Sequence, residues 1–331
     1  MLKADFSDML LAAVDARTEF FNPENNNAFR LFNGFTEGEP GISADLYART
    51  LVLHNYGKRP EAYTELLDTA ETTLLKRFPW IQSVVRKIRY APSPEERNGI
   101  IRGEQPDTVI IENGVHYAIN LCLNQDTSFY LDTRNLRVWI KDSLLGKSVL
   151  NMFAYTGSLG IAARVGGAQP VTNLDLSTMF LNIGKTSLKL NGLQQTENEF
   201  LRMDFWSAVK QFKQNNTHFD CIILDPPFFT KTRKAMLDLN KDTARLINKV
   251  RPLVRNEGWL VIVNNALFLP GVELYSSISG LCSDGYLALE QIIPVPLDMT
   301  GYPRTVCSTP PVDPSPFNHP TKIIVTRVFH K

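Results

Sequence analysis

Short apolar runs alternate with longer amphipathic stretches from about residue 149 onward. The runs lie at 149–154, 170–175, 200–204, 219–225 and 259–265, and the segments between them space their apolar residues as helices do. Strands buried on both faces consist almost entirely of apolar residues, and their alternation with helices is typical of βαβ units. The pattern therefore predicts an α/β domain with a mostly parallel, doubly wound sheet.

The first 120 residues follow a different pattern. Helical spacing extends to about residue 21, an Asn- and Pro-rich stretch interrupts it, and short strand-like and helix-like segments follow. This order predicts a helical arm over 1–27, a small α+β domain over 28–120 and the larger α/β domain over 121–331. Within the last of these, the loop 294–320 contains eight of the chain's 20 prolines, and we expect irregular structure there.

Composition refines the picture mainly by exclusion. Hydrophobic residues make up 44% of the 331 residues, the net charge is +1, and no apolar run reaches the roughly 18 residues of a membrane helix. These values exclude a highly charged disordered chain, and we expect a soluble, cytoplasmic protein without a membrane partner. The four cysteines are widely separated and no histidine stands at zinc-site spacing, so the sequence predicts no metal site.

One stretch of the chain is locally basic. Between Phe229 and Arg255, eight Lys and Arg residues stand against two acidic residues. Lys231, Arg233 and Lys234 are therefore candidates for contacts with the phosphates of a nucleic acid, although a solvated helix face has the same composition.

Candidate chemistry gathers where the predicted parallel strands end, which is where such sheets bind their ligands. Gly157 follows the first strand and lets the backbone approach a ligand closely, and Asp175 follows the second, where it can accept hydrogen bonds from a ribose diol. Asp204 follows the third strand and can accept from an adenine amino group. Asp225 begins a rigid Asp-Pro-Pro-Phe corner after the fourth. Each residue alone also fits a turn or a helix cap, but their order indicates a nucleoside-containing cofactor.

A dinucleotide cofactor requires a different loop. Dinucleotide-binding folds carry G-x-G-x-x-G after the first strand, because the pyrophosphate contacts that backbone. Only Gly157 and Gly160 are present here, and Tyr155 stands in place of the first glycine. The sequence therefore disfavours an NAD-dependent enzyme.

Three longer segments carry a resemblance to a known family. They are VLNMFAYTGSLGIAARVGGA (149–168), TNLDLSTMFLNIGKTSLKLNGL (172–193) and FDCIILDPPFF (219–229). Together they resemble the class I S-adenosylmethionine-dependent methyltransferases, most of all the group that modifies 23S ribosomal RNA. That group includes cytosine-C5 enzymes and the guanine-N7 half of a bifunctional large-subunit enzyme.

A fourth segment, NQDTSFYLDTR (124–134), is similar to the hairpin DTGxxLDxR of this family, although Ser128 stands where the family has glycine. The loop 294–320 has no counterpart in the family pattern. The cytosine-C5 enzymes begin with a PUA domain, and we expect none in this chain.

The resemblance implies a Rossmann-like methyltransferase fold, S-adenosylmethionine as cofactor with S-adenosylhomocysteine as product, and RNA, in particular 23S ribosomal RNA, as partner. It implies cofactor contacts for Thr127, Ser128, Tyr130, Arg134, Asn151, Phe153, Tyr155, Thr156, Gly157, Asp175, Leu176, Ser177, Asp204 and Phe205. It also implies that the acceptor corner, Asp225, Pro226, Pro227 and Phe228, lies where cofactor and acceptor base meet. A flipped base would stack on Phe228 or Phe229, although the two rings could also anchor the next helix.

The end of the predicted strand 259–265 bears on the target atom. Asn264 and Asn265 stand there, as an Asn-Asn pair does in the guanine-N7 relatives, whereas the cytosine-C5 relatives carry their nucleophilic cysteine at this place. An amide can present a donor and an acceptor to a base edge but cannot add to a pyrimidine ring, so guanine N7 is the favoured target. The two asparagines could also simply cap the next helix.

Two other functions stay open at this point. The first is a 5-methylcytosine enzyme that uses Cys307, the one cysteine in the Pro-rich loop. The second is a non-catalytic RNA-binding or assembly factor that retains the fold, which the missing PUA domain and the unusual Ser128 would suit.

Overall fold

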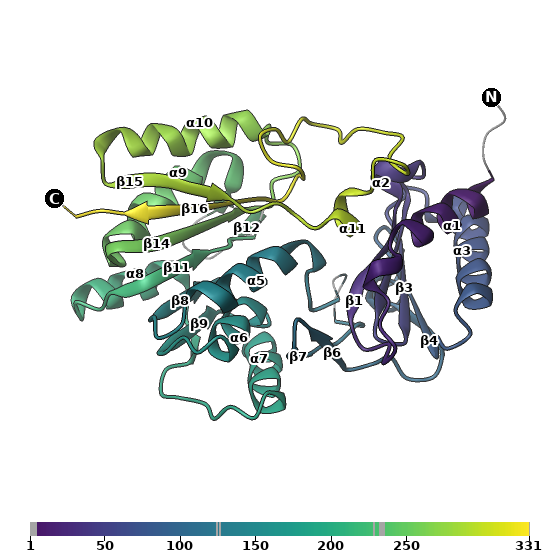
Figure 1. Cartoon of the computed structure of the whole chain (residues 1–331), viewed down its shortest axis with the longest axis horizontal. Helices are drawn as coiled ribbons and strands as arrows, with labels where there is room; N and C mark the ends of the chain where they lie inside the picture. The colour runs from purple at the N-terminus through teal and green to yellow at the C-terminus, as the bar shows by residue number, and fades with distance from the viewer. Residues whose placement is uncertain (1–4, 124, 126, 228, 232–235, 331) are drawn as a thin grey trace. The chain divides into compact units, whose positions relative to one another are not determined.

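The computed structural model describes residues 5–123, 125, 127–227, 229–231 and 236–330, and the chain forms two compact units (Figure 1). The first unit consists of Met1–Leu131 and Pro296–Pro310. The second consists of Asp132–Val295 and Pro311–Lys331.

These units differ from the domains that the sequence predicts. The boundary lies at 131/132 rather than 120/121, the N-terminal arm is part of the first unit, and residues 296–310 of the Pro-rich loop belong to the first unit as well. Local patterns do not encode such membership, because it depends on contacts between segments that are far apart in the chain.

A five-stranded mixed sheet is the centre of the first unit, in the order β1-β2-β3-β4-β5. β3 and β4 are parallel, and the other neighbouring strands are antiparallel. One face of this sheet packs on α1 and α3 around Phe29, Leu46 and Leu74. A separate hairpin pairs β6 with β7. The elements are α1 (Phe6–Ala16), β1 (Ala28–Asn33), α2 (Gly34–Glu37), β2 (Ile42–Tyr47), β3 (Thr50–Asn55), α3 (Thr64–Arg77), β4 (Ser83–Ile88), α4 (Pro94–Asn98), β5 (Ile100–Gly103), β6 (Val109–Glu112), β7 (Val115–Ala118) and α11 (Leu297–Thr300).

A seven-stranded sheet is the centre of the second unit, in the order β10-β9-β8-β11-β14-β16-β15. The first five of these strands are parallel, and β16 is antiparallel to both of its neighbours. The mostly parallel sheet that the sequence predicts is therefore confirmed. The elements are α5 (Arg134–Ser143), β8 (Val149–Met152), α6 (Ser158–Val165), β9 (Val171–Asp175), α7 (Thr178–Leu190), β10 (Phe200–Arg202), α8 (Phe205–Gln214), β11 (Phe219–Leu224), β12 (Phe229–Lys231), β13 (Met236–Asp238), α9 (Leu239–Val250), β14 (Val254–Asn264), α10 (Gly271–Leu281), β15 (Leu287–Ile292) and β16 (Lys322–Val328).

Both faces of the larger sheet are covered, which explains why its strands are apolar runs. Along β11, Ile222 belongs to the core shared with α8, α9 and α10, whereas Ile223 belongs to the core shared with α5 and α6. The strand order reverses between β8 and β11, since β9 and β10 lie on one side and β14 on the other. In such sheets this switch point, at the carboxyl ends of the strands, is where ligands bind.

The described residues show neither a membrane-spanning helix nor a metal-binding cluster. None of the helices in the described ranges is long and apolar enough to cross a membrane. The same part of the chain contains no group of three or more His, Cys, Asp or Glu side chains placed to hold a metal ion.

Close packing at Gly160 generates a stability prediction. A Cβ at this position would lie 2.0 Å from Oδ1 of Asn173, which is fully buried and bonded to Asn151. Gly160→Ala should therefore lower the free energy of unfolding by about 1–3 kcal/mol, measured by urea denaturation. Gly280→Ala is the matched helical control, because a Cβ there meets no atom within 4 Å, and it should stabilise by about 0.5–1 kcal/mol. Equal effects of the two substitutions would contradict this packing.

Candidate functional site

The loop between β8 and α6 has an unusual backbone. Phe153, Tyr155 and Gly157 have φ angles of +60°, +52° and +78°, so every second residue is left-handed. For a bulky residue this conformation costs on the order of 1–3 kcal/mol and persists only where the surroundings enforce it. The loop lies at the switch point of the sheet, so the strain is concentrated where a ligand would bind.

Asp175, at the end of β9, holds this loop in place. Its Oδ2 accepts a hydrogen bond from the backbone N–H of Tyr155 at 2.9 Å, and its Oδ1 accepts one from the N–H of Ser177 at 2.9 Å. The backbone adds a third link, in which Ala154 donates to the carbonyl of Leu174 at 2.8 Å. Partial burial raises the pKa of Asp175, while the backbone hydrogen bonds, chiefly that from Ser177, oppose the shift. The predicted ribose ligand is thus also the residue that shapes the loop.

Aromatic and apolar side chains surround this carboxylate. Tyr155 contacts Phe180 edge to face, with ring centroids 4.5 Å apart, and Phe153 stacks on Phe205 at 5.4 Å. Leu176 and Met179 lie beside Asp175 in sequence, and about half of each side chain is exposed. Exposed large apolar side chains next to a charged group are a common lining of a small-molecule site.

Asn151 carries a buried polar atom that lacks a partner. Its Nδ2 donates to Oδ1 of Asn173 on the neighbouring strand at 3.0 Å. Its Oδ1 is buried and accepts no hydrogen bond from the described residues. Such orphaned acceptors are rare in protein interiors, and at the end of β8 this one is placed to receive a donor from a ligand or a water molecule.

Asp204 is fully explained as a helix cap. Its Oδ1 accepts from the N–H of Ser207 at 3.0 Å, and its Oδ2 accepts from the hydroxyl of Ser207 at 2.6 Å. The next residue, Phe205, is buried in the core. A contact between Asp204 and adenine stays a prediction, and the cap accounts for the residue without it.

The acceptor corner contains an acid with a strongly shifted pKa. Asp225 follows β11, and burial together with the negative charge of Asp132 raises its pKa to about 7. Asp132 itself accepts a hydrogen bond from the hydroxyl of Thr321 at 2.7 Å. Pro226 is buried and Pro227 is exposed, whereas Phe228 lies outside the described residues.

Asn264 is held by two hydrogen bonds at the end of its strand. This residue ends β14 and is fully buried. Its Nδ2 donates to the hydroxyl of Thr243 at 3.1 Å, and its Oδ1 accepts from the N–H of Ala266 at 2.9 Å. The amide therefore fixes the loop after β14, and its contact with a base stays a prediction. Asn265 is exposed, so its predicted contact with a base stays open.

Lys322 fixes the same loop from the neighbouring strand. It pairs with Asn264 in the sheet, and its buried Nζ donates to the carbonyls of Ala266 at 2.9 Å and Pro320 at 2.6 Å. Burial lowers the pKa of Lys322 to about 8.

The predicted hairpin contacts are divided between the two units. Thr127, Ser128 and Tyr130 belong to the first unit, and Arg134 begins α5 of the second. Ser128 has a φ of +60°, which is the conformation that favours the glycine of the family pattern, and its hydroxyl accepts from the N–H of Asn120 at 2.6 Å. A serine can therefore replace that glycine here. Cofactor contacts of these four residues stay predictions.

Thr156, Ser177 and one of the three basic residues lie among the described residues. Thr156 is buried in the loop after β8, and Ser177 caps α7 by accepting from the N–H of Phe180 at 3.3 Å. Of the three basic residues expected to contact phosphates, Arg233 and Lys234 lie outside the described residues, and Lys231 is described only as the last residue of β12.

Comparison with known proteins identifies the family. Residues 34–278 match the model of the S-adenosylmethionine-dependent methyltransferase family. The chain belongs to this family. The predictions of a class I methyltransferase fold, of methyltransferase chemistry and of S-adenosylmethionine as cofactor are thereby confirmed at the level of the family.

Individual relatives agree with this assignment. A ribosomal RNA large subunit methyltransferase I of Aeromonas salmonicida is 33% identical over 234 residues, which are 70% of this chain and 59% of that protein. The chain thus spans less than two thirds of this relative. The solved structure of SMU.776, a methyltransferase complexed with SAH, superposes with a TM-score of 0.84 at 23% identity. The structure of a methyltransferase from Streptococcus mutans superposes with a TM-score of 0.82 at 23% identity. Each of the two superpositions covers 98% of this chain and 81% of the other chain.

The sequence did not reveal the link between Asp132 and the acceptor corner. Asp132 lies in the hairpin segment quoted above, but no local signal connects it to Asp225, which is far along the chain. Only the fold brings the two carboxylates close enough for one charge to act on the other.

The raised pKa of Asp225 predicts a pH-dependent stability. Because the folded protein keeps this proton up to about pH 7 while the unfolded chain releases it near pH 4, the wild type loses stability as the pH rises between these values. Asp225→Asn removes the ionisation, so its stability relative to the wild type should grow by up to roughly 1.4 kcal/mol per pH unit in this window. Urea denaturation at pH 5, 6, 7 and 8 measures the difference, with the exposed Asp142→Asn as control. A difference that does not change with pH would contradict the raised pKa.

Proposed function

We propose that this protein is a methyltransferase that uses S-adenosylmethionine to methylate RNA of the large ribosomal subunit, with guanine N7 as the favoured target. The observation that carries the cofactor part of this proposal is the double hydrogen bonding of Asp175, which joins the end of β9 to the left-handed loop after β8. The rRNA part rests on the names of the relatives.

The residues at the switch point suit the parts of S-adenosylmethionine. The Asp175 carboxylate has acceptor capacity left for the ribose hydroxyls, and Leu176 and Met179 offer apolar surface for the adenine. The N-terminus of α6 suits the carboxylate of the methionine part. The unpaired Oδ1 of Asn151 suits a donor such as the methionine amino group.

When bound, S-adenosylmethionine supplies an electrophilic methyl group and leaves as S-adenosylhomocysteine. Transfer to a base nitrogen is an in-line displacement, so the protein contributes mainly by positioning the two reactants. Guanine N7 has an in-plane lone pair, and no base has to remove a proton before it attacks.

The protonation of Asp225 favours guanine over adenine and cytosine as the acceptor base. The edge of guanine at N7 presents two acceptors, N7 and O6. With a pKa of about 7, a large share of Asp225 is protonated at neutral pH and can donate a hydrogen bond to O6. An ionised Asp225 could only accept hydrogen bonds, and the amino groups of adenine and cytosine require such an acceptor.

Cytosine C5 chemistry finds less support. It needs a thiolate near the acceptor corner, but Cys221 is fully buried within β11, where burial raises the pKa of its thiol. Cys307 is exposed and belongs to the first unit. For the RNA itself, Lys231, Arg233 and Lys234 follow the acceptor corner directly and are proposed to contact its phosphates.

The proposed cofactor site predicts a specific loss of affinity. Asp175→Ala removes a charged acceptor for two hydroxyls and the support of the loop, so the affinity for S-adenosylhomocysteine should fall at least tenfold, or about 1.5–3 kcal/mol. Isothermal titration calorimetry measures this. The exposed Asp142→Asn is the control and should leave the affinity within about twofold. Unchanged affinity in Asp175→Ala would remove the ribose assignment.

The proposed target predicts a defined product. Nucleoside mass spectrometry of ribosomal RNA from a strain that lacks this protein should show the loss of one 7-methylguanosine, which the wild-type gene restores and the Asp175→Ala gene does not. Loss of 5-methylcytidine instead, with Cys307→Ala failing to restore it, would overturn the choice of guanine N7. If no modification is lost, the non-catalytic alternative gains support.

A further inference from the structure

Residues 296–310, here termed the strap, are an excursion of the C-terminal part of the chain. The chain leaves the second unit after Val295, contributes the strap to the first unit, and re-enters the second unit at Pro311. Together with the link at 131/132, the two units are therefore joined by three covalent connections. The strap includes the short helix α11, and it is fastened to the first unit at three places.

The first fastening is at Asp298, which is fully buried. Its Oδ2 accepts from the backbone N–H of Arg30 at 2.9 Å, and its carbonyl accepts from the guanidinium of Arg17 at 2.8 Å. The carbonyl of the next residue, Met299, accepts from Nδ2 of Asn33 at 2.6 Å. Arg30 and Asn33 lie on β1, an edge strand of its sheet. The strap thus satisfies a backbone donor that an edge strand otherwise exposes.

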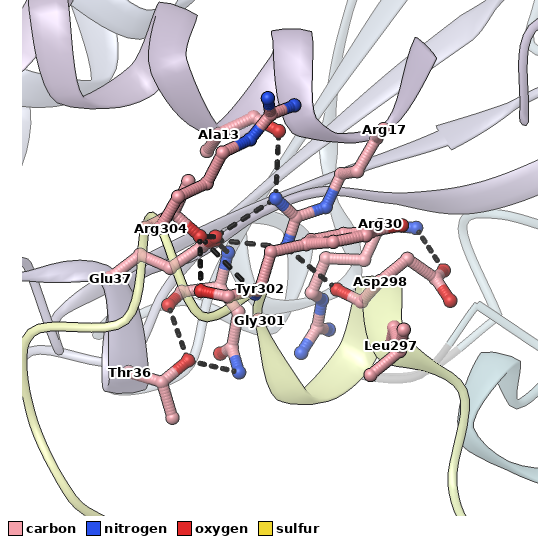
Figure 2. Close-up of polar contacts among 12 residues, drawn as sticks. Ala13, Arg17, Arg30, Thr36, Glu37, Leu297, Asp298, Gly301, Tyr302 and Arg304 are labelled. Atoms are coloured by element: carbon pink, nitrogen blue, oxygen red, sulfur yellow. Dashed lines mark hydrogen bonds and ion pairs between the residues drawn. The ribbon is translucent and has the colours of Figure 1, made fainter. Parts of the chain in front are cut away.

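The second fastening is a buried ion pair (Figure 2). Arg17 and Glu37 form two hydrogen bonds, at 2.9 and 3.0 Å, and their side chains are 0% and 1% exposed. Glu37 also accepts from the hydroxyl of Thr305 in the strap, and Arg17 lies 5.3 Å from the ring centroid of Tyr302. Because two buried charges are costly unless they are fully bonded, this clamp of Arg17 and Glu37 depends on the strap being in place.

The third fastening is at the far end of the strap. The N–H groups of Cys307 and Ser308 donate to the carbonyl of Thr36 at 2.9 and 3.1 Å, and the hydroxyl of Ser308 donates to the carbonyl of Phe35 at 2.7 Å. The acceptors are backbone carbonyls of α2. Hydrogen bonds therefore hold the strap to the first unit both near its beginning and near its end.

Both flanks of the strap are fixed within the second unit. Val295 donates to Oδ1 of Asn318 at 2.9 Å and accepts from Nδ2 of the same residue at 2.8 Å, which closes the excursion at its base. The carbonyl of Pro294 accepts from Asn135 at 2.9 Å, and the carbonyl of Asp313 accepts from the N–H of Gly271 at 3.0 Å.

The free lengths of chain between these fixed points are short. Asp298 is the third residue after Val295, and Asp313 is the fifth residue after Ser308. An extended chain spans at most about 3.3–3.6 Å per residue, so these connections reach about 11 Å and about 18 Å when fully stretched. As long as the strap stays fastened, Asp298 stays within the first of these distances of Val295, and Asp313 stays within the second of Ser308.

We propose that the strap is a tether that restricts the movement of the two units relative to each other, and that the clamp of Arg17 and Glu37 together with Asp298 keeps it fastened. Breaking these contacts leaves the covalent connection but lengthens the free chain between Val295 and Asp313 to the whole strap. The range of movement between the units then increases.

Amide hydrogen exchange tests the fastening in the full chain. In Arg17→Met, the protection of the amides of Arg30, Cys307 and Ser308 should fall at least tenfold. Arg164→Met is the matched control, because it breaks the buried ion pair between Arg164 and Glu199 inside the second unit, and these amides should keep their protection there. Asp298→Ala leaves Arg17 and Glu37 paired and should also lower the protection of these amides. It replaces Arg17→Met in this test if Arg17→Met does not fold.

Pulsed electron–electron double resonance, which measures the distances between two spin labels, tests the tether. Spin labels are attached to cysteines that replace the exposed Glu65 on α3 and Lys210 on α8, with Cys122, Cys282 and Cys307 changed to serine. The width of the distance distribution should at least double in Arg17→Met or Asp298→Ala and stay unchanged in Arg164→Met. Unchanged amide protection in both strap variants would overturn the fastening. Lost protection with an unchanged distance distribution would overturn the tether.

Discussion

The hydrogen bond between the Asp175 carboxylate and the backbone N–H of Tyr155 is the interaction on which the candidate site depends. It joins the end of β9 to the loop that follows β8, and that loop contains two bulky residues in left-handed conformation. Without a fixed acceptor, nothing in the intrinsic preferences of Phe153 or Tyr155 would hold this conformation. The same carboxylate is the proposed ligand of the cofactor ribose, so the shape of the site and its binding chemistry share one side chain.

The larger sheet makes this arrangement possible. Its parallel strands end at one edge, and the reversal of strand order between β8 and β11 opens that edge to a ligand. Asp175 and Asp225 stand at strand ends on either side of the reversal, in different environments. Backbone N–H groups surround the first, whereas burial and the charge of Asp132 keep a proton on the second. A cofactor site and an acceptor site can therefore lie at one edge and perform different tasks.

The sequence predicts those features that local patterns encode. The apolar run 219–225 corresponds to β11. The end of an apolar run marks the end of a strand, so the positions of the acidic residues after the strands could be predicted. The hydrogen bond from the Asn264 amide to Thr243 could not be predicted, because Thr243 comes from a helix 21 residues earlier. The coupling of Asp132 to Asp225 and the place of the strap in the first unit were hidden for the same reason. Each depends on contacts between distant segments, and only the fold creates them.

The central claim is that this chain transfers a methyl group from S-adenosylmethionine to large-subunit ribosomal RNA. Incubation of the purified protein with S-adenosylmethionine labelled in the methyl group and with RNA of the large subunit from the deletion strain tests it directly. Label should enter the RNA to about one methyl group per molecule, and Asp175→Ala should leave it at background. A protein that binds S-adenosylhomocysteine but transfers no label to this RNA, free or assembled into the subunit, would contradict the claim.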